Sequence, residues 1–309
     1  MDLTTSYLGL TLANPLVASA CSLTGTPEGA RRIEGLGFGA LVVRSVFEEQ
    51  LPGGAGAEAV APVDPAAYLA HLRDIRAAVG IPVIASINCR SPAGWAAFAR
   101  EIEATGVHAL EMNLYDIVDD PALSSSDVET READLVAAVA ASTRLPVSVK
   151  LGPHYTALIP FARRLEAAGA KGLVLFNRFM QPDINIETGH LRFNVNFSRA
   201  EDVRMPLRWT AILREHVKLD LAVSGGVHDT NAAIQGVLVG GNAVCLCSAL
   251  YLRHGANPAA EILDGLRGWL ARKGHMKLDE IRGTMRNTNL GHKAGFERAH
   301  YVKTLGAAR

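Results

Sequence analysis

The chain has 309 residues, of which 49% are hydrophobic and 20% are charged. Lysine and arginine together number 31, as do aspartate and glutamate, so the formal net charge is zero. This composition allows one large buried core and argues against disorder, and the balanced charge argues against a surface for nucleic acid or acidic membranes.

The four cysteines each lie in or at the end of an apolar run, and none belongs to a CxxC or Cys/His metal motif. They are Cys21, Cys89, Cys245 and Cys247. On a strand, Cys245 and Cys247 would share a face but lie about 6–7 Å apart, too far for a disulfide. We therefore expect reduced thiols, no metal site and a cytoplasmic protein. The N-terminal sequence predicts no signal peptide, and no run approaches transmembrane length.

The first predicted element is a short hairpin, formed by Leu3–Tyr7 and Leu8–Leu12 around Gly9, which could plug the floor of a barrel. From there, apolar strand-like runs alternate with helical segments. The predicted strands are Pro15–Ala18, Ala40–Ser45, Pro82–Ile87, Ala109–Asn113, Pro146–Leu151, Gly172–Phe176, Leu221–Val223 and Ala243–Cys247. The predicted helices are Pro27–Leu36, Ala66–Val79, Pro92–Ala104 with Ser91 as N-cap, Val128–Ser142, Leu158–Ala168, Pro206–His216, Asn231–Val239 and Pro258–Arg272. Eight strand–helix pairs predict one α/β domain over residues 1–309, a (β/α)8 TIM barrel.

Three segments depart from this alternation. A glycine-rich loop, Pro52 to Gly56, precedes the second helix. Residues 178–205 are polar, and the alternation from Phe193 to Phe197 predicts an inserted hairpin over the barrel mouth, after the sixth strand. The tail from Lys277 is basic, with a predicted helical stretch over Asp279–Met285, and it could pack on the barrel, form an oligomer contact or fray.

The last two predicted strands both end in small residues. The first ends at Ser224-Gly225-Gly226, and the second ends at Cys247-Ser248-Ala249. Neighbouring parallel strands that end this way expose backbone N–H groups without a Cβ in front of them, which is typical of a phosphate cradle. In TIM barrels the phosphate site often follows strands 7 and 8. The alternative is that these glycines only allow tight turns between strand and helix.

The carboxyl ends of the other predicted strands carry amides, hydroxyls and cations, and no pair of carboxylates. These residues are Ser19, Arg44, Ser45, Asn88, Asn113, Lys150, Asn177 and Arg178. A lysine that ends a buried strand is costly unless it meets an anion or a polar ring. The set therefore favours a planar polar heterocycle over a hydrolytic reaction. Arg44 could instead pair with Glu48 or Glu49, and the asparagines could instead cap loops.

Motifs distributed along residues 3 to 270 resemble those of the dihydroorotate dehydrogenases, which are FMN-containing (β/α)8 enzymes. Each motif is weakly specific alone, but their order and strand placement are specific. They are Tyr7-Leu8-Gly9-Leu10 with Asn14-Pro15, Ala18-Ser19, Val42-Val43-Arg44-Ser45, Ile87-Asn88, Glu111-Met112-Asn113-Leu114, Val149-Lys150-Leu151, Leu175-Phe176-Asn177, Ser224-Gly225-Gly226 and Cys247-Ser248-Ala249.

The resemblance implies FMN as cofactor and a homodimer as assembly. It implies that the phosphate is held by Ser224, Gly225, Gly226, Cys247 and Ser248, and that Lys150 lies beside the pyrimidine edge of the flavin. It further implies that the flavin and ribityl chain are lined by Ala18, Ser19, Ser45, Asn88, Asn113 and Asn177. The reaction of the family passes a hydride from substrate to flavin while a base removes a neighbouring proton.

Two stretches depart from the family pattern. The family places a Cys or Ser base three residues after the strand-4 asparagine, where this chain has Asp116, preceded by Tyr115. Asp116 could act as the base if burial raised its pKa, or it could be a loop residue. After the second strand the family has a lysine and an asparagine-rich loop that grips orotate. This chain has Arg44 and a glycine-rich loop, and arginine favours carboxylates or stacked rings.

These observations predict an FMN-dependent oxidoreductase, dihydroorotate dehydrogenase-like and acting on CH–CH bonds, with a small polar, anionic substrate. Arg44, Asn113, Asn177 and Arg178 are the expected substrate contacts, with His154 a further candidate for the anion. Tyr115 and Asp116 are the candidate proton-transfer residues. The alternatives are a true dihydroorotate dehydrogenase of pyrimidine biosynthesis with Asp116 as base, and a flavin-free phosphate-binding barrel with Lys150 as Schiff-base lysine. A third is a flavin subunit that passes electrons to a partner protein.

Overall fold

The computed structural model describes residues 1–309 apart from 53–59, 92–94, 193–195, 254, 287–295 and 308–309. Eight parallel strands form a closed barrel in the described chain, which confirms the predicted TIM barrel. They are β3 Leu16–Ala18, β4 Ala40–Val42, β6 Val83–Asn88, β7 Ala109–Leu114, β8 Val147–Leu151, β9 Gly172–Leu175, β12 Asp220–Ser224 and β13 Ala243–Leu246. The barrel closes where β4 pairs with β6, with Leu41 opposite Val83. A two-residue strand, β5 Val46–Phe47, extends the pairing along β6.

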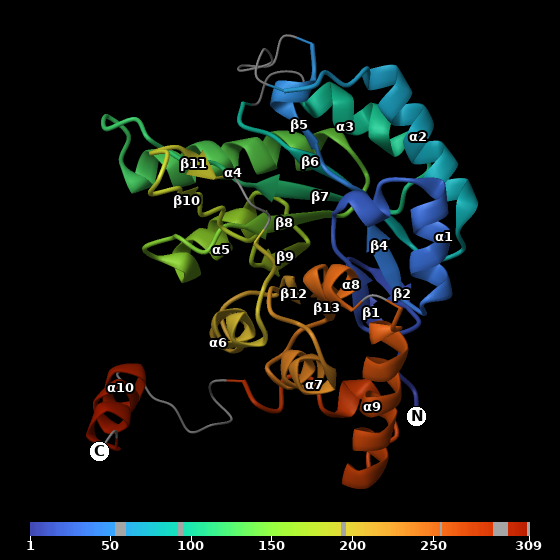
Figure 1. Ribbon diagram of the computed structural model, residues 1–309, viewed down its shortest axis with the longest axis vertical. Coiled ribbons are helices and arrows are strands. Elements are labelled where there is room, and N and C mark those ends of the chain that lie inside the picture. The colour runs from blue at the N-terminus through green and yellow to red at the C-terminus, as the bar shows by residue number, and fades with distance from the viewer. Residues whose placement is uncertain (53–59, 92–94, 193–195, 254, 287–295, 308–309) are drawn as a thin grey trace.

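Helices surround the barrel and cover its outer face (Figure 1). They are α1 Pro27–Gly35, α2 Pro65–Ala78, α3 Trp95–Glu103, α4 Ser125–Ser142, α5 Leu158–Ala167, α6 Arg204–Leu213, α7 Thr230–Leu238 and α9 Pro258–Lys273. Side-chain caps set several starts: Thr26 accepts from Gly29 N–H at 3.0 Å, and Ser124 forms a capping box with Asp127. No helix in the described chain is both long and apolar enough to span a membrane.

The hairpin of β1 Thr5–Tyr7 and β2 Leu10–Leu12 closes the floor of the barrel, as predicted. Tyr7 and Leu12 are fully buried and pack with the barrel-facing side chains of the strands. The turn needs positive φ at Leu8 and Gly9, and the Leu8 N–H donates to Asp220 at 2.7 Å. Because Asp220 begins β12, this bond fixes the hairpin at the amino-terminal ends of the strands.

The segment after β9 contains the predicted inserted hairpin, but its strands lie earlier than the predicted alternation. They are β10 Asp183–Ile184 and β11 Leu191–Arg192. The turn between them is closed by the Gly189 N–H, which donates to the Asn185 carbonyl at 2.8 Å, with Gly189 at φ +68°. This turn therefore sets the strand positions.

Some predictions fall on residues outside the described ranges. Residues 193–195 of the alternation, most of the glycine-rich loop from Pro52 to Gly56, and residues 92–94 at the start of the predicted third helix lie there. Ser91, the predicted N-cap of that helix, donates its hydroxyl to Glu48 at 2.6 Å.

The predicted helix over Asp279–Met285 is wrong. A single 3-10 turn, Leu278–Glu280, is followed by turns, because Gly283 adopts a left-handed conformation at φ +69°. Arg282 anchors this stretch by donating to Thr5 Oγ1 at 2.8 Å. A further helix that was not predicted, α10 Phe296–Ala307, lies apart from the barrel (Figure 1).

The floor hairpin supplies the first prediction. Leu12→Ala should lower the free energy of unfolding by about 2–5 kcal/mol, because it opens a cavity among fully buried side chains. Urea denaturation measures this loss. Thr11→Ala is the matched control, because Thr11 is exposed on the same strand. Equal effects of the two substitutions would show that the hairpin does not close the barrel core.

Candidate functional site

A cavity of about 770 Å³ lies at the carboxyl ends of the barrel strands, beneath the inserted segment. Its volume lies in the range of small-molecule sites. The predicted site residues that line it are Ser19, Lys150, Asn177, Arg178, Ser224, Gly225, Gly226, Cys247 and Ser248. The inserted segment covers it with Asn196, Phe197, Ser198, Glu201 and Asp202, and the start of α6 adds Arg204, Met205 and Pro206. The ends of β3, β8, β9, β12 and β13 thus meet at one cavity, although they are far apart in the chain.

The loop after β12 has the geometry of an anion cradle. Gly225 and Gly226 have φ values of +101° and +75°, and their N–H groups donate to no acceptor among the described residues. A Cβ on Gly226 would lie 2.2 Å from the backbone nitrogen of Val203, whereas a Cβ on Gly225 would meet nothing closer than 3.9 Å. Gly226 therefore allows the inserted segment to pack on the loop, and Gly225 leaves the cavity side open.

The end of β13 completes the cradle. The Ser248 hydroxyl accepts a hydrogen bond from the Ser198 N–H at 2.9 Å, and the Ser198 hydroxyl lies 3.0 Å from His228 Nε2. Ser248 begins a short helix, α8 Ser248–Leu252, which was not predicted because five residues carry no periodicity. A short extra helix after the last strand is common in TIM barrels that bind phosphate.

Lys150 is a buried cation on the cavity wall. It lies on β8 and is only 8% exposed, yet its ammonium group forms no ion pair or hydrogen bond with the described residues. Glu111, the charge of opposite sign on the adjacent strand β7, lies deeper in the barrel and has one carboxylate oxygen without a partner. Burial raises the pKa of Glu111, and the charge of Lys150 opposes that rise. The ammonium group is therefore available to an anionic or polar ligand.

The predicted asparagines form a chain of hydrogen bonds that begins at the cavity. Asn177 donates to Asn113 Oδ1 at 2.8 Å, and Asn88 donates to the Asn113 carbonyl at 2.9 Å. Only Asn177 of the three lines the large cavity. The other two support it from the ends of β7 and β6.

The remaining predicted cofactor residues lie away from the cavity lining. Ala18 is fully buried in β3, and the Ser45 hydroxyl is bonded to Ser86 at 2.7 Å. Arg44 is exposed at the end of β4 and pairs with neither Glu48 nor Glu49. The structure therefore separates the strand-2 residues from the group around Lys150.

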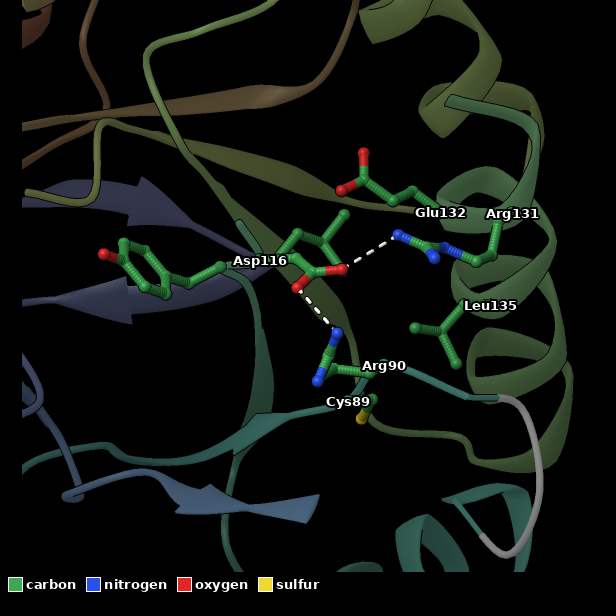
Figure 2. A pocket seen from close by; sticks show the side chains of 8 residues that line it. Cys89, Arg90, Asp116, Arg131, Glu132 and Leu135 are labelled. Atoms are coloured by element: carbon green, nitrogen blue, oxygen red, sulfur yellow. Dashed lines mark hydrogen bonds and ion pairs between the residues drawn. The ribbon is translucent and has the colours of Figure 1, made fainter. Parts of the chain in front are cut away.

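Asp116 is held between two arginines, as Figure 2 shows. Its carboxylate accepts from Arg131 at 2.9 Å and lies 3.1 Å from the guanidinium of Arg90. It borders a cleft of only about 10 Å³, enough for roughly one water molecule, and not the large cavity. Tyr115 points its hydroxyl to the inserted segment, where it accepts from the Met180 N–H at 3.1 Å.

A second carboxyl in this cleft, Glu132 on α4, has an unusual environment. It is 7% exposed, and its carboxylate accepts a hydrogen bond from the Tyr155 hydroxyl at 3.1 Å. Burial raises the pKa of Glu132 to about 7, and the Tyr155 hydrogen bond opposes this rise. Glu132 can therefore take up a proton in the folded protein near neutral pH.

The rim of the cavity carries groups suited to an anion. Arg178 pairs with Asp202 at 3.0 Å, so an incoming anion would compete with that carboxylate. His154 also lines the cavity, and its ring packs edge-on against Phe179, with centroids 4.7 Å apart. His154 belongs to the loop after β8, and Arg178 belongs to the loop after β9.

Cys21 and Tyr251 are among the cavity residues that sequence reasoning missed. The inward alternation of Val17, Ser19 and Cys21 beyond β3 was a usable signal for the cysteine. No local signal marked Tyr251, because its position follows from the unpredicted helix α8.

The fold and cavity define a TIM-barrel protein with a ligand-sized site at the carboxyl ends of its strands. No family model matches the chain. The chain is 29% identical to a putative dihydroorotate dehydrogenase A (fumarate) of Aeropyrum pernix, over 91% of the chain and 97% of that protein. It is 29% identical to the dihydroorotate dehydrogenase B (NAD(+)) catalytic subunit of Methanocella arvoryzae, over 92% of the chain and 97% of that protein. These similarities confirm the predicted resemblance to the dihydroorotate dehydrogenases.

Glu132 supplies a prediction on pH. Because its folded pKa of about 7 exceeds the usual value of 4.5, the folded state binds a proton that the unfolded state has lost between these values. Stability should therefore fall as pH rises from about 4.5 to 7, by at most about 3 kcal/mol at 1.36 kcal/mol per pKa unit. Glu132→Gln should remove this loss of stability. The free energy of unfolding of the variant, relative to that of the natural protein, should therefore increase as the pH rises toward 7.

Urea denaturation across that pH range measures the effect. Asp134→Asn, which removes an exposed carboxylate from the same helix, is the control and should show no such gain. A constant difference between Glu132→Gln and the natural protein at every pH would contradict the prediction.

Proposed function

We propose that this protein is an FMN-dependent oxidoreductase of the dihydroorotate dehydrogenase type, which transfers a hydride between FMN and a small polar, anionic substrate. The names of its relatives support the reaction class. The observation that carries the proposal is the placement of a buried, unpaired Lys150 and the Gly225-Gly226 cradle in one cavity of suitable size.

The residues of the cavity fit FMN. The free N–H groups of Gly225 and Gly226, with the hydroxyls of Ser224 and Ser248, would hold the phosphate. Ser19, Lys150 and Asn177 would contact the ribityl chain and ring. When bound, FMN supplies the hydride chemistry that no protein side chain provides.

Lys150 has two roles in this proposal. It holds a positive charge against the cavity, where it stabilises negative charge that develops on a bound ring. Its charge also opposes the rise that burial causes in the pKa of Glu111. A cation fixed by the barrel needs no reorganisation when charge develops, so its effect is greater than that of a mobile surface lysine.

The asparagine chain orients the site. Asn177 is fixed on both sides, because it donates to Asn113 and accepts from the Arg178 N–H at 2.9 Å. The second N–H of the Asn177 side-chain amide can therefore donate to a ligand in only one direction. Asn113 on β7, itself bonded by Asn88 on β6, holds this amide in a fixed position.

The substrate anion is proposed to meet Arg178 and His154 at the rim. Arg178 is partly exposed and its partner Asp202 belongs to the segment that covers the cavity. Exchange of Asp202 for a substrate carboxylate would couple substrate entry to the position of that segment. Arg44, at the end of β4, remains a candidate for a second contact from the far side of the barrel mouth.

Asp116 is proposed to fix its loop instead of acting as the base. Its ion pairs with Arg90 and Arg131 keep the carboxylate on the outer side of the loop, and a base there would require both pairs to open. Tyr115 is the better placed proton-transfer candidate of the two, because its hydroxyl reaches the covering segment. The second candidate function, a true dihydroorotate dehydrogenase with Asp116 as base, is distinguished by experiment below.

Gly226→Ala tests the cradle. The added Cβ meets the Val203 backbone and should displace the covering segment, which weakens FMN binding by at least about tenfold, or about 1.4 kcal/mol. Gly9→Ala is the matched control, because Gly9 has a similar φ of +73° with open space around it. Flavin fluorescence titration measures both dissociation constants. Equal affinities in the two variants would place the FMN phosphate elsewhere.

Anaerobic addition of dihydroorotate to the FMN-loaded protein tests the substrate. The departures at Asp116 and Arg44 predict that the flavin absorbance stays unbleached. Bleaching that is lost in Asp116→Asn would establish the second candidate function. Bleaching that persists in Asp116→Asn would make dihydroorotate the substrate with a different base.

A further inference from the structure

We propose that Cys21 and Cys247 form a reactive dithiol in the wall of the cavity, which hydroperoxides oxidise to a disulfide. The two residues are 226 positions apart in the chain, yet both line the same cavity from the segments that follow two adjacent strands. The sequence pattern relates Cys247 only to Cys245, two residues away, and gives no sign that Cys21 lies near it.

The barrel geometry brings the two thiols together. Strands β3 and β13 are parallel neighbours, with Ala18 opposite Leu246, and the Ser19 N–H donates to the Leu246 carbonyl at 2.9 Å. Cys247 directly follows β13, and Cys21 lies three residues beyond the end of β3. Their side chains hydrogen-bond to each other, and all four cysteines of the chain are free thiols.

The surroundings of Cys21 favour its thiolate. The thiol of Cys247, the hydroxyl of Tyr251 and the backbone N–H groups of Leu23 and Thr24 all donate to the sulfur. The Cys247 donor is the largest influence, and together these lower the pKa of Cys21 to about 6. The pKa of Cys247 is raised, because its proton is shared with Cys21.

Tyr251 is held in place for this contact. Its hydroxyl is 2.6 Å from the Ser22 hydroxyl and accepts from the Ser22 N–H at 3.1 Å, and its ring stacks on Phe197 at a centroid distance of 5.1 Å. The charge of Lys150 also acts on the pair, because it opposes the rise in the pKa of Cys247. Cys21 and Cys247 are both partly exposed, so a small oxidant entering the cavity can reach them.

The other two cysteines lack these features. Cys89 and Cys245 are buried, and burial raises the pKa of each thiol, to about 12 for Cys245. Since the thiolate is the nucleophile, reactivity in the folded protein should be confined to Cys21 and its neighbour.

The reaction has two steps. The Cys21 thiolate attacks an oxygen of the hydroperoxide, the O–O bond breaks, and the departing alkoxide takes a solvent proton to become an alcohol, leaving a sulfenic acid on Cys21. Cys247 then attacks the Cys21 sulfur, the S–S bond forms, the S–O bond breaks, and hydroxide leaves with the thiol proton as water. Two sulfur atoms lose two electrons in total, and these electrons reduce the O–O bond.

The first experiment measures the pH dependence of thiol alkylation in the folded full-length protein, with peptide mass spectrometry to locate the label. Cys21 should react first, with a rate that is half-maximal near pH 6. Cys247→Ala should shift this midpoint upward by about one unit or more, because the largest donor is lost. A midpoint near that of an ordinary thiol, or first labelling at Cys89 or Cys245, would overturn the proposal.

The second experiment treats the folded protein with hydrogen peroxide. Two of the four thiols should be lost, a Cys21–Cys247 peptide should appear, and dithiothreitol should restore both thiols. The crosslink should be absent in Cys21→Ser and retained in Cys245→Ser, with thermal unfolding as the check that each variant is folded. A sulfinic acid on Cys21 without a crosslink, or four intact thiols, would contradict the proposal.

Discussion

The burial of a positive charge at the end of β8 is the constraint on which the rest of the site depends. A cation taken out of water is stable only beside compensating charge. The barrel gives Lys150 part of that compensation through Glu111 on β7, which is more deeply buried and also incompletely bonded. The upper side of the ammonium faces a cavity and no protein anion in the described chain. Lys150 is therefore placed to interact with an anionic or polar group bound in the cavity.

The two ends of the barrel are closed in different ways. At the amino-terminal ends, the hairpin fills the interior with Tyr7 and Leu12 and leaves a close-packed apolar layer. At the carboxyl ends, the inserted segment covers the cavity without filling it. The contact of Gly226 with Val203 and the hydrogen bond from the Ser198 N–H to Ser248 attach it to the ends of β12 and β13.

The sequence predicted the barrel, its floor and the cradle, because each is encoded by local periodicity or by small residues where strands end. It could not predict contacts between distant segments. The position of Asp116 depends on two arginines from different elements, and the pairing of Cys21 with Cys247 depends on the closure of the barrel. The helical stretch predicted over Asp279–Met285 does not form, and Gly283 within it adopts a left-handed conformation. Local patterns thus predicted the strand ends that line the cavity, whereas the individual contacts of those residues required the fold.

The most direct test of this account is the reduction potential of FMN bound to Lys150→Met and to Lys171→Met, compared with the natural protein. Lys171 is exposed at the other end of the barrel and is the matched control. If Lys150 stabilises negative charge on the bound ring, Lys150→Met should lower the potential by about 30 mV or more, equivalent to about 1.4 kcal/mol for two electrons, and Lys171→Met should leave it unchanged. An unchanged potential in Lys150→Met, or a natural protein that takes up no FMN, would contradict the account.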